Sequence, residues 1–136
     1  MMDKWQQIAG SLKGAFGTIT VIADGHEVAF YKRVDGERLV IETYVDGWIK
    51  GKWTSVDEHG RPEHPEGRFY RPRNRRAWPL KEYSRLKRVF GKKKADEMTA
   101  LRTMIVSPYW NSPRPLISHL KKHFPDLELL PRDEVV

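Results

Sequence analysis

Hydrophobic and polar residues alternate along the first half of the chain, and three Asp-Gly pairs divide this alternation into four runs. The pairs lie at 24–25, 35–36 and 46–47, at a spacing of 11 residues. Asp-Gly favours a type I′ hairpin turn, in which both central residues have positive φ. The runs are rich in β-branched and aromatic residues, which are typical of strands: Phe16–Ala23, His26–Val34, Glu37–Val45 and Trp48–Ser55. The pattern predicts a four-stranded antiparallel meander with one buried face.

Two segments flank this predicted meander. Before it, Lys4–Leu12 places apolar residues on one side of a short helix. After it, Asp57–Gly67 (DEHGRPEHPEG) has the Pro and Gly content of a polar loop, and Gly67–Arg71 is expected to add a fifth strand.

The second half of the chain changes to helical periodicity. Three helices are expected: Leu80–Phe90 after Pro79, Ala95–Val106, and a third one that begins at Ser112 and ends before Pro125. Their predicted inward residues are Leu80, Tyr83, Leu86 and Phe90; Met98, Leu101, Met104 and Ile105; and Leu116, Ile117, Leu120 and Phe124. The sequence therefore predicts one α+β domain over residues 1–136, with the meander at 16–71 and the helical part at 79–124.

The distribution of charge along the chain predicts a binding surface in addition to the fold. The net charge is +7, but residues 69–94 alone carry 11 Lys and Arg and one acid, so the remainder has a net charge of −3. Such segregation is typical of nucleic-acid-binding proteins. The predicted phosphate contacts lie in an arginine loop stiffened by Pro72, on one side of the following helix and just beyond it: Arg71, Arg73, Arg75, Arg76, Lys81, Arg85, Arg88, Lys92, Lys93 and Lys94.

Aromatic residues add two further expectations. Phe69, Tyr70 and Trp78 flank the arginines and are candidates for stacking on unpaired bases, whereas Tyr83 and Phe90 fall on the apolar side of the predicted helix and are assigned to the core. Outside this segment, the candidate anchors for a protein interface are Trp48, Trp53 and Trp110.

Other functions find less support in the sequence. His59 and His64 lie in an acidic loop without a zinc-binding spacing, and His119 and His123 are taken as solvated helix residues, so no metal or other cofactor is expected. The chain has no Walker A loop and no G-x-S-x-G, and we expect no enzyme. A helix-turn-helix is disfavoured because the predicted connection from Val106 to Ser112 is longer than the usual turn.

Localisation follows from what the chain lacks. No apolar run is long enough to span a bilayer, the first residues have no apolar signal-peptide core, and there is no cysteine. A cytoplasmic protein is expected. Membrane binding by the basic helix is disfavoured because its apolar stripe is expected to cover the sheet.

Two stretches, GWIKGKW (Gly47–Trp53) and FYRPRNRRAW (Phe69–Trp78), give the chain a likeness to a known group of proteins. It resembles the small, basic, cysteine-free accessory proteins that phages and prophages encode, which include anti-CRISPR proteins. The leading hypothesis is a non-catalytic protein that binds nucleic acid or a nucleoprotein. The alternative is an inhibitor of a host nucleic-acid-processing or defence enzyme, similar to an anti-CRISPR protein, that either masks an acidic surface of the enzyme or binds alongside its nucleic acid. The three tryptophans and the loop Asp57–Gly67 would supply its contacts.

Overall fold

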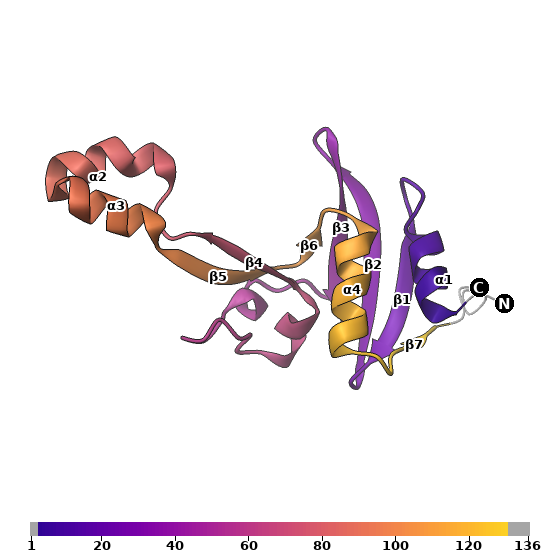
Figure 1. Cartoon of the computed structure of the whole chain (residues 1–136). Coiled ribbons are helices and arrows are strands. Elements are labelled where there is room, and N and C mark those ends of the chain that lie inside the picture. The colour runs from indigo at the N-terminus through magenta and orange to yellow at the C-terminus, as the bar shows by residue number, and fades with distance from the viewer. Residues whose placement is uncertain (1–2, 131–136) are drawn as a thin grey trace.

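The computed structural model describes residues 3–130, except for the side chain of Arg75, and shows a sheet-and-helix body from which a long arm projects (Figure 1). The body is built on a five-stranded sheet of order β6-β3-β2-β1-β7, in which every neighbouring pair is antiparallel. The predicted α+β class and antiparallel sheet are confirmed. None of the helices within residues 3–130 is long and apolar enough to cross a membrane.

The first three predicted strands are present as β1 (Thr18–Ala23), β2 (His26–Asp35) and β3 (Arg38–Val45). Asp24 and Gly25 both have positive φ, of 53° and 83°, as a type I′ turn between β1 and β2 requires. The short strand β7 (Glu128–Leu129) pairs with β1 and completes this edge of the sheet.

Helices α1 (Lys4–Ser11) and α4 (Pro113–His123) close one face of the sheet. Asp3 caps α1 through a capping box with Gln6. The inward face of the sheet and the two helices share one core, whose fully buried members include Ile8, Leu12, Val21, Val28, Phe30, Ile41, Val45, Leu116 and Leu120. The predicted helices at both ends of the chain are therefore correct, and no helix within residues 3–130 covers the opposite face of the sheet.

The predicted fourth strand, Trp48–Ser55, is wrong. The turn at Asp46 and Gly47 does form, but it leads only to a single bridge between Val45 and Trp48, and a 3₁₀ helix (η1, Gly51–Thr54) follows. The place beside β3 belongs instead to β6 (Tyr109–Trp110), whose Trp110 lies opposite Ile41. A distant segment thus displaces the adjacent one from the sheet edge.

The arm begins with a two-stranded ribbon of β4 (Arg71–Arg76) and β5 (Arg102–Ser107). A helical hairpin of α2 (Tyr83–Phe90) and α3 (Lys92–Ala100) lies at its far end, after a 3₁₀ turn (η3, Leu80–Glu82) (Figure 1).

Three predictions for this region are wrong. The expected arginine loop is a strand, the expected strand Gly67–Arg71 is replaced by a 3₁₀ helix over Pro65–Phe69 (η2) and the start of β4, and the helix expected to reach Val106 ends at Ala100. Thr103, Ile105 and Val106 are β-branched, and in the ribbon they pair with β4.

The position of the arm also corrects the predicted core. Helix α2 does not cover the sheet, so of its predicted inward residues only Leu86 is buried, while Tyr83 is half-buried and Leu80 and Phe90 are exposed. Leu101, expected to point inward, is 55% exposed at the start of β5.

The polar loop Asp57–Gly67 lies against the base of the arm. The carboxylate of Asp57 accepts hydrogen bonds from the backbone N–H groups of His59 and Arg61, and these bonds lower the pKa of Asp57. Gly60 sits so close to Met104 of β5 that an added Cβ would lie 2.8 Å from that side chain. The loop thereby supports one face of the ribbon.

Candidate nucleic-acid interface

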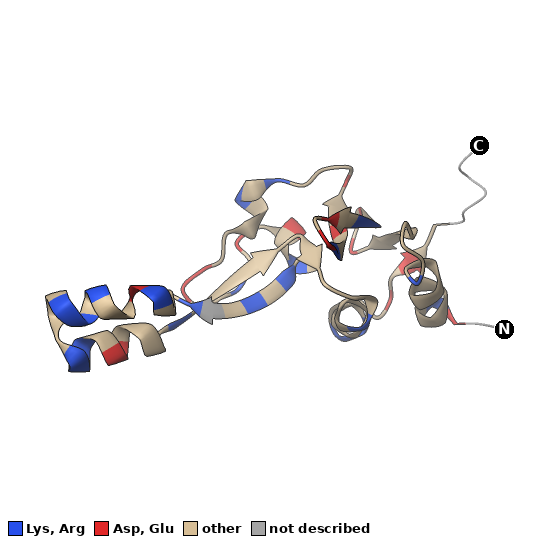
Figure 2. Cartoon of the chain, turned by 90° about the horizontal axis from the view of Figure 1, so that it is seen from above, with Lys and Arg blue, Asp and Glu red and all other residues tan. Residues whose placement is uncertain are grey.

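The positive charge of the protein is concentrated on the arm. Residues 71–107 contain twelve Lys and Arg and three acids, which gives a net charge of +9, while the rest of the chain carries −2. Figure 2 shows the basic residues spread along β4 and around the helical hairpin. The projecting segment is therefore a polycation attached to a body that is close to neutral.

The strand pattern divides the arginines of β4 between the two faces of the ribbon. Arg71 and Arg73 lie on the face of Ile105, opposite to the face that carries Pro72 and Met104. Burial and the adjacent charge of Arg73 lower the pKa of Arg71. Two neighbouring guanidinium groups that repel each other form a favourable place for an anion.

The opposite face of the ribbon carries a second like-charged pair. Arg76 of β4 is directly paired with Arg102 of β5, an arrangement that is unfavourable without a counter-charge. Arg102 was missed by sequence reasoning because the segment was expected to be helical. The β-branched residues that follow Arg102 were the feature of the sequence that indicated a strand here.

Arg75 also belongs to β4, and its side chain lies outside the described part of the structure. The other predicted cations lie in η3 or on the helical hairpin, and all of them are exposed: Lys81, Arg85, Arg88, Lys92, Lys93 and Lys94. Lys87, which was not among the predicted contacts, is exposed beside them. Arg85 has an ion pair with Glu82 at 3.6 Å. It is the only ion pair in the arm among the side chains that the structure describes, which exclude that of Arg75. The other described cations of the arm are not neutralised internally.

A small core fixes the hairpin that carries these cations. Leu86, Ala95 and Thr99 are buried between α2 and α3. Tyr83 donates a hydrogen bond from its hydroxyl to Asp96 at 2.6 Å, which raises the pKa of Tyr83 and links the two helices. Asp96 is thereby engaged within the hairpin, and Glu82 by Arg85. Two of the three acids of the arm thus have partners inside it.

The structure separates the aromatic candidates. Phe69 and Tyr70 are fully buried, and Phe69 stacks on Phe124 with ring centroids 4.4 Å apart, so neither ring is available to a base. Trp78 is 38% exposed. Phe90, which the sequence assigned to the core, is 54% exposed and is the last residue of α2.

The three tryptophans proposed as interface anchors also differ in accessibility. Trp48 is 62% exposed beside the turn at Gly47, whereas Trp53 and Trp110 belong to the body's core. Of the three, only Trp48 offers a surface to a partner.

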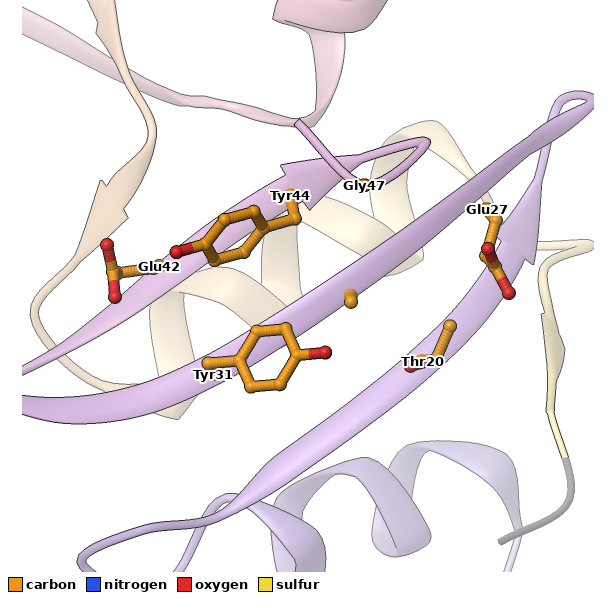
Figure 3. Close-up of a pocket in the computed structure, with 7 residues that line it drawn as sticks. Thr20, Glu27, Tyr31, Glu42, Tyr44 and Gly47 are labelled. Atoms are coloured by element: carbon orange, nitrogen blue, oxygen red, sulfur yellow. The ribbon is translucent and has the colours of Figure 1, made fainter. Parts of the chain in front are cut away.

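A second surface is a shallow hollow on the sheet face that carries no helix (Figure 3). Tyr31 and Tyr44 lie on it from neighbouring strands in an edge-to-face pair with centroids 5.3 Å apart. Glu42 and Glu27 make its surroundings acidic, although Arg33 pairs with Glu42. Burial and the charge of Glu42 raise the pKa of Tyr44. The hollow is thus unlike the arm in charge and is a poor site for phosphate.

The histidines do not form a metal site within the described residues, where no three His, Cys, Asp or Glu side chains lie close enough to hold an ion. His119 is half-buried rather than solvated, and its Nε2 lies 2.7 Å from the carbonyl oxygen of Arg68. Burial lowers the pKa of His119, and the neighbouring charges of His123 and Lys122 lower it further. His123 is exposed, as expected.

The arm therefore brings together all the predicted phosphate-binding positions, and it adds Arg102, Lys87 and the exposed ring of Phe90. Comparison with known proteins found no matching family model, no matching curated protein and no matching solved structure.

Proposed function

We propose that this protein is a non-catalytic nucleic-acid-binding protein that contacts the phosphates of DNA, RNA or a nucleoprotein through its arm. The observation that carries the proposal is the net charge of +9 on residues 71–107, placed on a segment that projects from a body of net charge −2.

The arrangement of these charges supports an external anion as the partner. Arg71 lies beside Arg73, and Arg76 is paired with Arg102, so like charges are held together at the base and the middle of the arm. A phosphate backbone reduces this repulsion and gains the entropy of its released counterions. An exposed surface without such a partner normally mixes both signs of charge.

Salt dependence tests the proposal directly. Fluorescence anisotropy of a labelled oligonucleotide is expected to show that affinity falls steeply between about 50 mM and about 200 mM salt, by roughly a thousandfold if six phosphates are contacted. Affinity that is absent, or that does not change with salt, would contradict the proposal.

Two double variants, each lacking two cations, test whether binding depends on the arm or only on the total charge of the protein. Arg73→Gln with Arg88→Gln removes two exposed cations from the arm, and the salt slope is expected to fall by about two. Arg114→Gln with Lys122→Gln removes two exposed cations from α4 and is expected to leave the slope unchanged. Equal effects of both pairs would show that binding does not depend on the arm.

One observation favours a protein partner as the second candidate function. Trp48 is 62% exposed on the body, where an indole ring is a common interface anchor. In this alternative the chain is an inhibitor of a nucleic-acid-processing enzyme, and the basic arm faces an acidic surface of that enzyme. Trp48→Ala would then weaken the complex, whereas it is expected to leave oligonucleotide binding unchanged.

A further inference from the structure

The far end of the arm exposes two large apolar side chains among cations. Val89 is 65% exposed and Phe90 54% exposed, and they lie just before Gly91, which joins α2 to α3 with φ of +87°. The segment from Lys87 to Lys94 contains five Lys and Arg and no acid. Figure 1 places this turn at the end of the arm that is most distant from the body.

The exposure of Phe90 follows from a fixed hairpin. Leu86, one turn earlier in α2, is only 4% exposed because it packs in the hairpin core with Ala95 and Thr99. The hydrogen bond between Tyr83 and Asp96 holds the two helices together. The buried side chains of α3, Ala95 and Thr99, are small, and more than half of the Phe90 side chain remains exposed.

The charges around Phe90 define the chemistry of its partner. Lys87, one turn before Phe90 on the same side of α2, and Lys92 and Lys93 just after Gly91 favour an anionic partner, and the exposed ring favours a flat apolar one. Nucleic-acid bases attached to phosphates supply both. We propose that Phe90 stacks on an unpaired base, so that the arm prefers single-stranded over duplex nucleic acid. This inference rests on the proposed function.

The geometry of base pairing explains why Phe90 would bind unpaired rather than paired bases. In a duplex, paired bases show only their edges in the grooves, and these edges are read by hydrogen bonds. A phenyl ring forms no such bond. An unpaired base offers its π face, and stacking on an aromatic side chain tolerates any sequence. Phe90 therefore discriminates between paired and unpaired bases without reading their identity.

The test compares one oligonucleotide of mixed sequence with its duplex at constant salt. Wild type is expected to bind the single strand more tightly, and Phe90→Ala is expected to lower that affinity about tenfold with little effect on the duplex. Phe90→Trp should retain the preference. Phe16→Ala is the matched control, since Phe16 is 79% exposed on the body. A 2-aminopurine base in the single strand reports stacking by a change in fluorescence that Phe90→Ala should remove.

The outcomes separate the two proposals. If Phe90→Ala leaves the single-strand preference and the 2-aminopurine fluorescence change intact while salt-dependent binding persists, stacking by Phe90 is overturned and phosphate binding stands. If wild type binds no nucleic acid, both fail. If Phe90→Ala abolishes binding to anionic phosphatidylserine vesicles but not to the single strand, the tip is a membrane contact and the inference is wrong. Unchanged circular dichroism and thermal unfolding of Phe90→Ala establish that the fold is retained.

Discussion

Arg76 donates a hydrogen bond from Nη1 to the carbonyl oxygen of Thr99 at 2.6 Å and thereby joins strand β4 to the last turn of helix α3. The carbonyl groups of a last helical turn have no partner within the helix, so the guanidinium satisfies one of them. The hydroxyl of Thr99 in turn donates to the Ala95 carbonyl at 2.9 Å. Among the predicted phosphate-binding residues, Arg76 is therefore a positioning residue that orients the hairpin.

Replacing Arg76 should loosen the arm more than it weakens phosphate binding. Arg76→Gln is expected to cost about 1–2 kcal/mol of local stability, because a charge-assisted and partly buried hydrogen bond is lost. Amide hydrogen exchange in the last turn of α3 should become faster. Arg73→Gln, which removes the same charge from the same strand, should leave this exchange unchanged. Equal exchange in the two variants would contradict the role assigned to Arg76.

His119 should make the stability of the body depend on pH. Burial first, and then the charges of His123 and Lys122, lower its pKa in the folded state, while the carbonyl of Arg68 opposes this effect. As pH falls through about 6.5, the unfolded chain takes up a proton that the folded chain does not, so folding stability decreases until the folded histidine also protonates. Thermal unfolding between about pH 7.5 and about pH 5.5 measures this.

The matched variants for this prediction are His119→Gln and His59→Gln. The first should flatten the pH dependence. The second, at an exposed histidine of the loop, should leave it as in wild type. A slope that survives His119→Gln would assign the dependence to another group.

Gly60 should be sensitive to a single added methyl group. Its φ is +77°, and a Cβ would lie 2.8 Å from the Cβ and Cγ of Met104. Gly60→Ala is expected to destabilise the fold by about 1–3 kcal/mol through backbone strain and this clash. In urea unfolding, Gly60→Ala combined with Met104→Gly, which removes both contacting carbon atoms, should recover part of the loss. Strictly additive effects would show that the added methyl group does not clash with β5.

Two tryptophans that contact the same lysine should differ in how much their truncation destabilises the fold. The Nζ of Lys50 lies 5.5 Å from the ring of Trp48 and 5.4 Å from that of Trp53. Trp53→Ala is expected to cost about 3–5 kcal/mol because the ring is buried. Trp48→Ala should change the free energy of unfolding by about 0.5 kcal/mol or less. Comparable losses in chemical unfolding would mean that Trp48 is packed in solution.

The sequence predicted the body well where the signals are local. The Asp-Gly turns and the alternation of apolar residues locate β1 to β3, and the apolar stripes locate α1 and α4. The fourth strand failed because its place beside β3 is taken by Trp110, a residue far along the chain. Local pattern contains no information about such a distant competitor.

The arm was harder to predict for a different reason. Strand β4 is rich in arginine and lacks apolar alternation, and its strand conformation depends on pairing with β5. Leu80 and Phe90 follow the helical period of a buried stripe, but α2 does not pack on the sheet and both side chains are exposed. Periodicity identifies which residues share a helix face, but burial depends on what the rest of the fold brings to that face. The clustering of Lys and Arg on one segment can be read directly from the sequence, because charge does not depend on packing, and phosphate binding by this cluster stays a prediction.

The pairing of Ile41 with Trp110 has a consequence for how this architecture can vary. The chain returns to the edge of β3 at β6, directly after the arm, and the two ends of the arm, Arg71 and Ser107, are paired with each other, so the arm is an excursion that leaves and rejoins the body at one place. The entropic cost of closing such an excursion rises only slowly with its length. Evolution or engineering can therefore lengthen, shorten or exchange the arm on a constant body, and the reach of the protein toward its target becomes an adjustable property.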